Sequence, residues 1–240
     1  MLTSFPWYDL PSVQWANDSL WRATGYPGEL NRQLAAADLW QDPGLLVSQA
    51  CGLDLFLSNA PIEPIAAPVF DLDCTPGMYY SYIVGDLKGQ TAAVNSLSSR
   101  SGWSALLSMC NPKNVVVTGS HQASIKALKS GKVDVAAIDA VTWRILARDT
   151  PESVAGLEIV GRSSEAMAPP YVGKLGAEHE TLFQSLHQAF GSPGSSTAKA
   201  ALLIGDIIPV QRQHYLPILT EYRSVTNEAS LKGQFVFSRL

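Results

Sequence analysis

The sequence predicts an α/β protein with mostly parallel sheets flanked by helices, and three observations predict it. Short apolar runs alternate with amphipathic stretches over most of the 240 residues, which is the pattern of strand–helix–strand units. The connections in the middle third are short and helical, as right-handed crossovers between parallel strands require. The chain is long enough for two small domains, and with 46% hydrophobic and 16% charged residues it can bury a full core.

The first third predicts strands joined by one clear amphipathic helix. A strand at 2–5 ends at Trp7-Tyr8-Asp9, and Pro11-Ser12 opens the helix. The apolar face of this helix carries Val13, Ala16, Leu20 and Trp21. Further strands are predicted at 45–47, 62–70 and 78–84.

The middle third has the most regular pattern. Trp103, Leu106, Leu107 and Cys110 fall at i, i+3, i+4 and i+7, which predicts one stripe of a helix. A second helix contains Ile125 and Leu128 and ends at Gly131. The predicted strands are 91–94, 114–117, 133–138 and 157–160, with a third helix at 141–148.

After residue 165 the pattern is looser. Ala168–Val172 reads as a turn into a strand, and residues 191–195 read as a loop. Helices are predicted at 180–190, 198–204 and 215–222. The last fifteen residues yield no prediction.

Composition excludes several classes of function. The net charge is −4 and there is no basic block, which argues against nucleic acid or an anionic membrane as partner. Cys51, Cys74 and Cys110 have neither disulfide-framework nor metal-site spacing, so buried free thiols are expected, although one pair could be bridged. No apolar run is long enough to span a bilayer, and no cofactor motif is present. The first residues lack a secretory signal, so either the chain is a processed form or the protein stays in the cytoplasm.

Polar residues gather where three neighbouring strands end. The loops 95–102, 118–121 and 139–142 each lead into a helix, and parallel strands place such loops at one edge of a sheet. Helix N-termini offer unpaired N–H groups and partial positive charge, which together hold small oxyanions without a lysine. The candidate contacts in these loops are Ser98, Ser99, Ser101, Ser120, His121 and Asp139.

Each candidate also has a purely structural explanation. Serine and aspartate are favoured N-caps, which could account for Ser120 and Asp139, although four serines between 96 and 101 exceed what capping needs. His121 is poorly placed against a helix dipole unless an anion lies over the turn, but a solvent-facing histidine is the alternative. Tyr8, Gln49 and Tyr171 lie elsewhere in the chain and could add contacts or be structural.

Catalysis is not expected from this sequence. GxSxG, HExxH, P-loop and dinucleotide motifs are absent. Ser120, His121 and Asp139 suggest a triad only superficially, because adjacent residues on one turn rarely give the required geometry. The chain is expected to be a binding protein rather than an enzyme.

Several motifs resemble one known family. Thr118-Gly119-Ser120-His121 with Ser124-Ile125, and Gly131 followed by Val133–Asp139, are similar to the TGSH and DVAAID motifs of phosphate, phosphite and phosphonate ABC-transporter substrate-binding proteins. Asn95–Gly102 resembles the serine-rich helix start of that family. Further similar stretches are Trp7–Pro11, Leu46–Gly52 and Ala168–Val172.

The resemblance implies the type II periplasmic-binding fold, with two α/β lobes and a ligand cleft between them. Lobe one would comprise residues 1–84 and 165–240, and lobe two residues 85–164. The family's anion contacts would fall on Ser98, Ser99, Ser101 and His121, with a polar ligand contact at Asp139. The implied partners are a small anionic ligand and an ABC permease, with no cofactor, no nucleic acid and no membrane insertion. A periplasmic location follows from the resemblance alone. The alternatives are an enzyme of cofactor biosynthesis on the same fold or a cytoplasmic ligand sensor.

Overall fold

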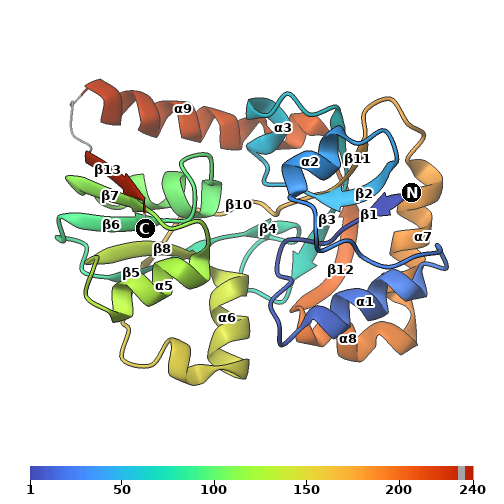
Figure 1. Cartoon of the computed structure of the whole chain (residues 1–240), viewed down its shortest axis with the longest axis horizontal. Helices are drawn as coiled ribbons and strands as arrows, with labels where there is room; N and C mark the ends of the chain where they lie inside the picture. The colour runs from blue at the N-terminus through green and yellow to red at the C-terminus, as the bar shows by residue number, and fades with distance from the viewer. Residues whose placement is uncertain (232–235, 240) are drawn as a thin grey trace. The chain divides into compact units, whose positions relative to one another are not determined.

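The computed structural model describes residues 1–231 and 236–239 and divides into two compact α/β units. Unit 1 comprises Met1–Met78 and Met167–Leu216, and unit 2 comprises Tyr79–Ala166 and Pro217–Leu240. Each unit has its own sheet flanked by helices (Figure 1). The expected α/β class with two units is therefore confirmed.

Unit 1 is built on a sheet whose strands come from both of its chain segments. The strand order is β1 (Leu2–Thr3), β2 (Leu45–Gln49), β11 (Tyr171–Lys174), β3 (Ile62–Phe70) and β12 (Ile204–Pro209). Only β1 and β2 pair in parallel, whereas β2–β11, β11–β3 and β3–β12 are antiparallel. The chain returns from unit 2 to insert β11 at the centre, so neither segment alone completes this sheet.

The helices of unit 1 cover this sheet with apolar faces. In α1 the buried residues are Ala16, Asn17, Leu20 and Trp21, which confirms the predicted stripe apart from the polar Asn17. α1 packs against α7 and α8, and the three lie together in Figure 1. The helical elements of this unit are α1 (Gln14–Ala23), α2 (Ala36–Gln41), α3 (Asp54–Leu57), α7 (Glu180–Gly191), η3 (Pro193–Ser195), α8 (Ser196–Ala201) and η4 (Arg212–Tyr215).

Unit 2 contains the sheet that carries most of the predicted site. The strand order is β13 (Val236–Arg239), β7 (Asn114–Val117), β6 (Thr91–Val94), β8 (Val135–Asp139), β5 (Ser81–Gly85) and β9 (Ile159–Arg162). The first four strands pair in parallel, and β5 is antiparallel to both of its neighbours. The carboxyl ends of β7, β6 and β8 consequently meet at one edge of the sheet.

The helices of unit 2 follow these strands. Val94, Trp103, Leu106 and Val135 belong to one buried apolar cluster between the sheet and the helix after β6. This packing fixes the start of that helix against the strand ends. The helical elements are η1 (Arg100–Ser104, a π-helix), α4 (Ala105–Leu107), α5 (His121–Lys129), α6 (Ala140–Asp149), η2 (Pro151–Ser153) and α9 (Leu216–Leu231).

The chain passes between the units three times. The first two passages, after Met78 and after Ala166, fall within the short strands β4 (Met78–Tyr79) and β10 (Ala166–Met167), which form a two-stranded sheet. The third follows Leu216 in α9. The predicted boundaries near 84 and 165 lie close to the first two passages, but the sequence did not predict the third, which places the residues after 216 with unit 2.

Several expectations about individual elements were wrong. Mainly parallel pairing holds in unit 2 but not in unit 1, because β11 and β12 run against β2 and β3. The predicted strand at 78–84 is divided between β4 and β5, since its two halves pair with different partners. The helix predicted at 198–204 ends at Ala201. Two residues later, Leu203 has a left-handed conformation (φ 57°) and turns the chain into the unpredicted strand β12.

The helix after β6 also differs from its prediction. Trp103 and Leu106 are buried as the stripe requires, but the first turn is a π-helix in which the Ser104 amide donates to the Ser99 carbonyl at 3.2 Å. The i→i−5 bonds widen this turn, and the regular α-helical part ends at Leu107, before Cys110.

Gly85 is expected to be required at the end of β5. Its φ is +103°, and a Cβ atom there would lie 2.1 Å from the Asp134 carbonyl oxygen, which is backbone and cannot turn aside. Gly85→Ala should lower the stability by about 2 kcal/mol or more, measured as a lower melting temperature. Gly191→Ala, where a Cβ meets nothing within 4 Å, is the control and should change stability by less than about 1 kcal/mol. Equal melting temperatures for the two variants would contradict this assignment.

Candidate functional site

The predicted loops of unit 2 lie at one sheet edge, as expected. Val94 at the end of β6 is the Cα partner of Val117 at the end of β7. The Thr118 amide donates to the Val94 carbonyl at 2.8 Å, and the Gly119 amide to the Asn95 carbonyl at 3.1 Å. Because both loops continue directly into helices, the N-termini of η1 and α5 lie side by side.

The serine turn, defined here as residues 96–101, is held by its own hydroxyls. Ser99 caps η1, with its Oγ accepting from the Gly102 amide at 2.9 Å. Ser98 pairs with Ser96 through their hydroxyls at 3.0 Å. Gly102 packs closely against the Asn95 side chain, so a Cβ atom there would force the amide of Asn95 to move. The turn is therefore closely packed around the start of the helix.

A chain of polar side chains links the serine turn to the second loop. Ser99 Oγ lies 3.3 Å from Ser101 Oγ, and Ser101 Oγ lies 2.9 Å from Nε2 of His121. Ser99 and Ser101 are buried. Ser120 has the role of an N-cap, since its Oγ accepts from the Ala123 amide at 3.1 Å. The predicted neighbours Ser99, Ser101 and His121 thus form one connected group.

His121 is held in its neutral form. Burial lowers the pKa of its imidazole to about 4, and the backbone of Ala137 opposes part of that decrease. Nδ1 is buried and makes no hydrogen bond of standard geometry with any residue that the structure describes. The imidazole at neutral pH is therefore a dipolar hydrogen-bonding partner of Ser101, and not a positive charge.

Both helix N-termini offer unpaired backbone donors. Within the described part of the chain, the amides of Arg100 and Ser101 in η1, and of His121 and Gln122 in α5, have no hydrogen-bond acceptor. Such first-turn amides carry the positive end of the helix dipole. Four N–H donors and the hydroxyls beside them suit the oxygens of a small anion.

Asp139 lies at the end of the third strand and acts as a cap. It is buried, and its Oδ1 accepts from the amides of Val141 at 2.8 Å and Thr142 at 3.1 Å, at the start of α6. This is the structural alternative that the sequence left open for this residue. A ligand contact by Asp139 stays a prediction.

Tyr8 and Gln49 belong to unit 1 and are close to each other there. Oε1 of Gln49 accepts from the amide of Trp7 at 3.0 Å, and Gln49 is the Cα partner of Tyr171 across β2 and β11. Tyr8 is non-glycine yet has a φ of +63°, a conformation that costs energy and is common where backbones contact ligands. Burial raises the pKa of the Tyr171 hydroxyl, and the Gln49 side chain opposes this. Contacts of Tyr8 and Gln49 with a ligand stay predictions.

The described residues give no sign of a metal or a membrane span. Within residues 1–231 and 236–239, no group of His, Cys, Asp or Glu is arranged to hold a metal ion. Cys51, Cys74 and Cys110 are not joined to one another by a disulfide, and all three are partly buried rather than fully buried as expected. In this part of the chain no helix combines the length and the hydropathy needed to cross a bilayer.

A family model decides what kind of protein this is. It describes the periplasmic substrate-binding protein of phosphonate ABC transporters and matches residues 81–215, which is more than half of the chain. The chain belongs to this phosphonate-binding family. The match covers every candidate site residue of unit 2, and it confirms the family that the serine-rich and TGSH motifs indicated.

Solved structures show the same fold. A binding-protein component of an ABC phosphonate transporter from Pseudomonas aeruginosa superposes with a TM-score of 0.74 at 15% identity, covering 94% of this chain and 86% of the other. A Prochlorococcus marinus protein in complex with methylphosphonate gives 0.68 at 15% identity, covering 90% and 92%. A Xanthomonas citri protein bound to chloride ion gives 0.62 at 15% identity, covering 95% and 99%. No curated protein matches the chain.

The phosphonate-binding family is one of substrate-binding proteins for transporters. The expectation of a binding protein rather than an enzyme is therefore confirmed. Membership also implies a small ligand and a permease partner.

Sequence reasoning missed one part of this site. Arg100, within the serine turn, has a fully buried side chain that contacts Ser163, Ser164 and Glu221. These partners lie more than sixty residues away along the chain. A basic residue among serines at the start of an otherwise apolar helix was the only available signal.

The neutral state of His121 predicts a pH dependence of stability in the ligand-free protein. Its pKa in the fold, about 4, lies below the 6.5 of an ordinary histidine, so the unfolded chain binds more protons between these values. The stabilisation is complete above pH 6.5 and is lost as the pH falls toward 4, by up to about 3 kcal/mol. Unfolding of wild type and His121→Gln at pH 7.5, 6, 5 and 4.5 should show the variant losing less stability on acidification. If the stabilities of wild type and His121→Gln fell by the same amount between pH 7.5 and 4.5, His121 would not be held neutral by burial.

Proposed function

We propose that this phosphonate-binding family member binds a small oxyanion of the phosphonate, phosphite or phosphate class at the shared N-termini of η1 and α5. The observation that carries the proposal is the connected group of Ser99, Ser101 and His121 beside four amides that have no acceptor among the described residues. Hydroxyl and amide donors converge there, and tetrahedral oxyanions have several acceptor oxygens to receive them.

The expected strength of binding agrees with a solute-capture role. Each hydrogen bond to a charged oxygen contributes about 1.5–3 kcal/mol net. Four or five such bonds, less the cost of association, give about −8 kcal/mol, which corresponds to a micromolar dissociation constant. An affinity in this range retains a dilute solute and still permits its release to a permease.

The electrostatics favour an anion over a neutral solute. First-turn amides and their helix dipoles present positive partial charge to a ligand. His121 is neutral at neutral pH, so it adds no formal charge to this potential. Asp139, the carboxylate at the end of β8, has its Oδ1 turned to two amides of α6, which reduces its repulsion of an incoming anion.

Melting temperatures with methylphosphonate, phosphite, phosphate and sulfate test the proposal. A ligand at a hundredfold excess over its dissociation constant stabilises the folded protein by about 2.7 kcal/mol. At least one phosphorus oxyanion should raise the melting temperature, and sulfate should raise it less. A folded sample whose melting temperature responds to none of the four anions would refute the proposal.

A matched pair of serine variants locates the site. Ser101→Ala removes a hydroxyl of the connected group and should weaken anion binding about tenfold or more in a calorimetric titration. Ser108→Ala removes a hydroxyl that only bonds the Ala105 carbonyl of the same helix, and it should leave the affinity unchanged. Equal affinities for the two variants would place the anion elsewhere.

A further inference from the structure

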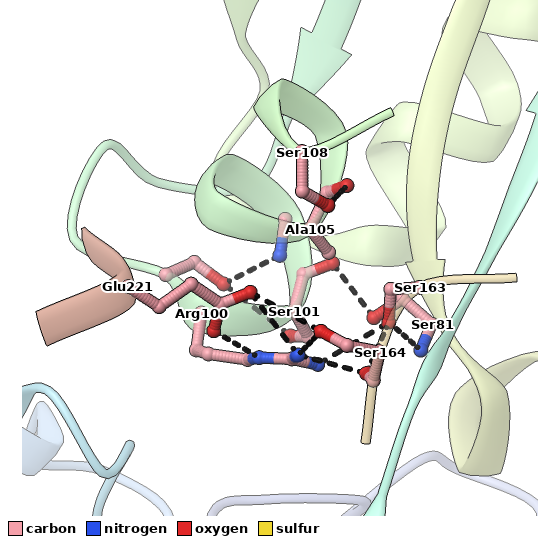
Figure 2. Close-up of polar contacts among 10 residues, drawn as sticks. Ser81, Arg100, Ser101, Ala105, Ser108, Ser163, Ser164 and Glu221 are labelled. Carbon is pink, nitrogen blue, oxygen red and sulfur yellow. Dashed lines mark hydrogen bonds and ion pairs between the residues drawn. The ribbon is translucent and has the colours of Figure 1, made fainter. Parts of the chain in front are cut away.

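Arg100 lies in the serine turn between two of the proposed ligand contacts, yet its side chain points away from solvent. The side chain is 0% exposed. Its Nε and Nη2 donate to the two carboxylate oxygens of Glu221 at 3.1 and 3.3 Å, a two-pronged pairing that only a guanidinium can make. Figure 2 shows the Glu221 side chain reaching the guanidinium from the α9 ribbon.

The rest of the guanidinium binds the chain segment before β10. Nη2 donates to the Ser164 carbonyl at 2.8 Å and to the Ser164 hydroxyl at 2.9 Å, and Nη1 lies 3.3 Å from the Ser163 hydroxyl (Figure 2). The same Ser163 hydroxyl accepts from the Ser81 amide at 3.0 Å. The Ser81 hydroxyl in turn donates to the Ser101 carbonyl at 2.8 Å, so the network returns to the serine turn.

These partners share a position in the chain. Each lies within a few residues of one of the three passages between units: Tyr79 and Ser81 follow the first, Ser163 and Ser164 precede the second, and Glu221 follows the third. The guanidinium also lies 5.8 Å from the centre of the Tyr79 ring. One side chain therefore contacts all three connecting segments from inside unit 2.

A purely structural role explains this arrangement poorly. Burying a charged pair costs desolvation, and a well-packed apolar side chain stabilises a core at least as well. A planar fork with fixed donors imposes strict geometry on every partner, because a shift of any one of them breaks short directional bonds. Such a shift would be transmitted to the Arg100 backbone, which carries one of the unpaired first-turn amides.

We propose that Arg100 is a positioning residue that couples the serine turn to the three connecting segments, so that the affinity of the turn for an anion depends on where those segments lie. The coupling rests on the proposed function for its ligand, but the network itself exists without ligand. This coupling is reciprocal. If the position of the connecting segments changes the affinity for an anion by some factor, anion binding must shift the equilibrium between those positions by the same factor.

The first test compares two carboxylate-to-amide variants of unit 2. Glu221→Gln removes the charge that pairs with Arg100. Glu165→Gln breaks the exposed ion pair with Arg162 in the same connecting segment, without touching Arg100. Glu221→Gln should weaken methylphosphonate or phosphite binding at least fivefold at a temperature where the variant is fully folded, whereas Glu165→Gln should stay within twofold of wild type.

The second test needs no ligand. Amide hydrogen exchange is followed at Trp103 and Ser104, which bond the Ser99 carbonyl, and at Ser163, which bonds the Ser81 carbonyl. Exchange should accelerate at both places in Glu221→Gln and at neither in Glu165→Gln. Arg100→Lys, which keeps the charge but loses the fork, should reproduce the effect and serves as the second variant if Glu221→Gln does not fold.

The two proposals fail in different ways. If wild type binds oxyanions but Glu221→Gln only melts earlier, with unchanged affinity and unchanged exchange at Trp103 and Ser104, the coupling is wrong and the binding function stands. If wild type binds none of the four anions, the binding function is wrong, and the ligand-free exchange alone decides the coupling. Faster amide exchange in Glu221→Gln at both the serine turn and Ser163 supports the coupling. Faster exchange at only one of these two places contradicts the coupling.

Discussion

The parallel pairing of β6 with its two neighbours is the constraint on which the candidate site depends. Backbone hydrogen bonds fix Val94 opposite Val117 and Ala93 opposite Ala136, so β6 and β7 end at one level, and β8 continues past them in the same direction to Asp139. Each strand leads into a helix, and the positive ends of the helix dipoles are brought together without any side chain doing so. The serines and His121 add specificity to a position that the sheet already provides.

The unit 2 site gains its positive potential from dipoles rather than from formal charges. His121 is neutral because burial opposes its protonation, and Arg100 is paired with Glu221. The chain as a whole carries a charge of −4. Attraction of an anion is therefore short in range and depends on the fit between its oxygens and the donors, which favours selection by shape over selection by charge alone.

Local patterns predicted the middle of the chain well. The strands at 91–94 and 114–117 have the predicted bounds, because each is a short buried run closed by turn-forming residues. The grouping of Ser99, Ser101 and His121 followed from one topological rule applied to those strands. Ser120 and Asp139 could not be decided from sequence, since a serine or aspartate in a cap looks the same whether or not it also meets a ligand.

Long-range pairing explains what sequence reasoning missed. β11 inserts between β2 and β3 from about a hundred residues further along the chain, and no local signal marks its direction. β12 was hidden by the helical composition of the residues before it, and only left-handed Leu203 separates the two. The contact of Arg100 with Glu221 spans 121 residues, a separation at which periodicity carries no information.

The return of the C-terminal segment to unit 2 has a consequence for how the protein is made. β13 extends the sheet beside β7, and α9 supplies the carboxylate that neutralises the buried Arg100. During synthesis, residues 79–166 emerge with one sheet edge uncovered and with Arg100 lacking its carboxylate partner until residues 217–239 leave the ribosome. Unit 2 therefore completes its sheet and pairs its buried arginine only after residues 217–239 have been made, although its other strands are complete by residue 166.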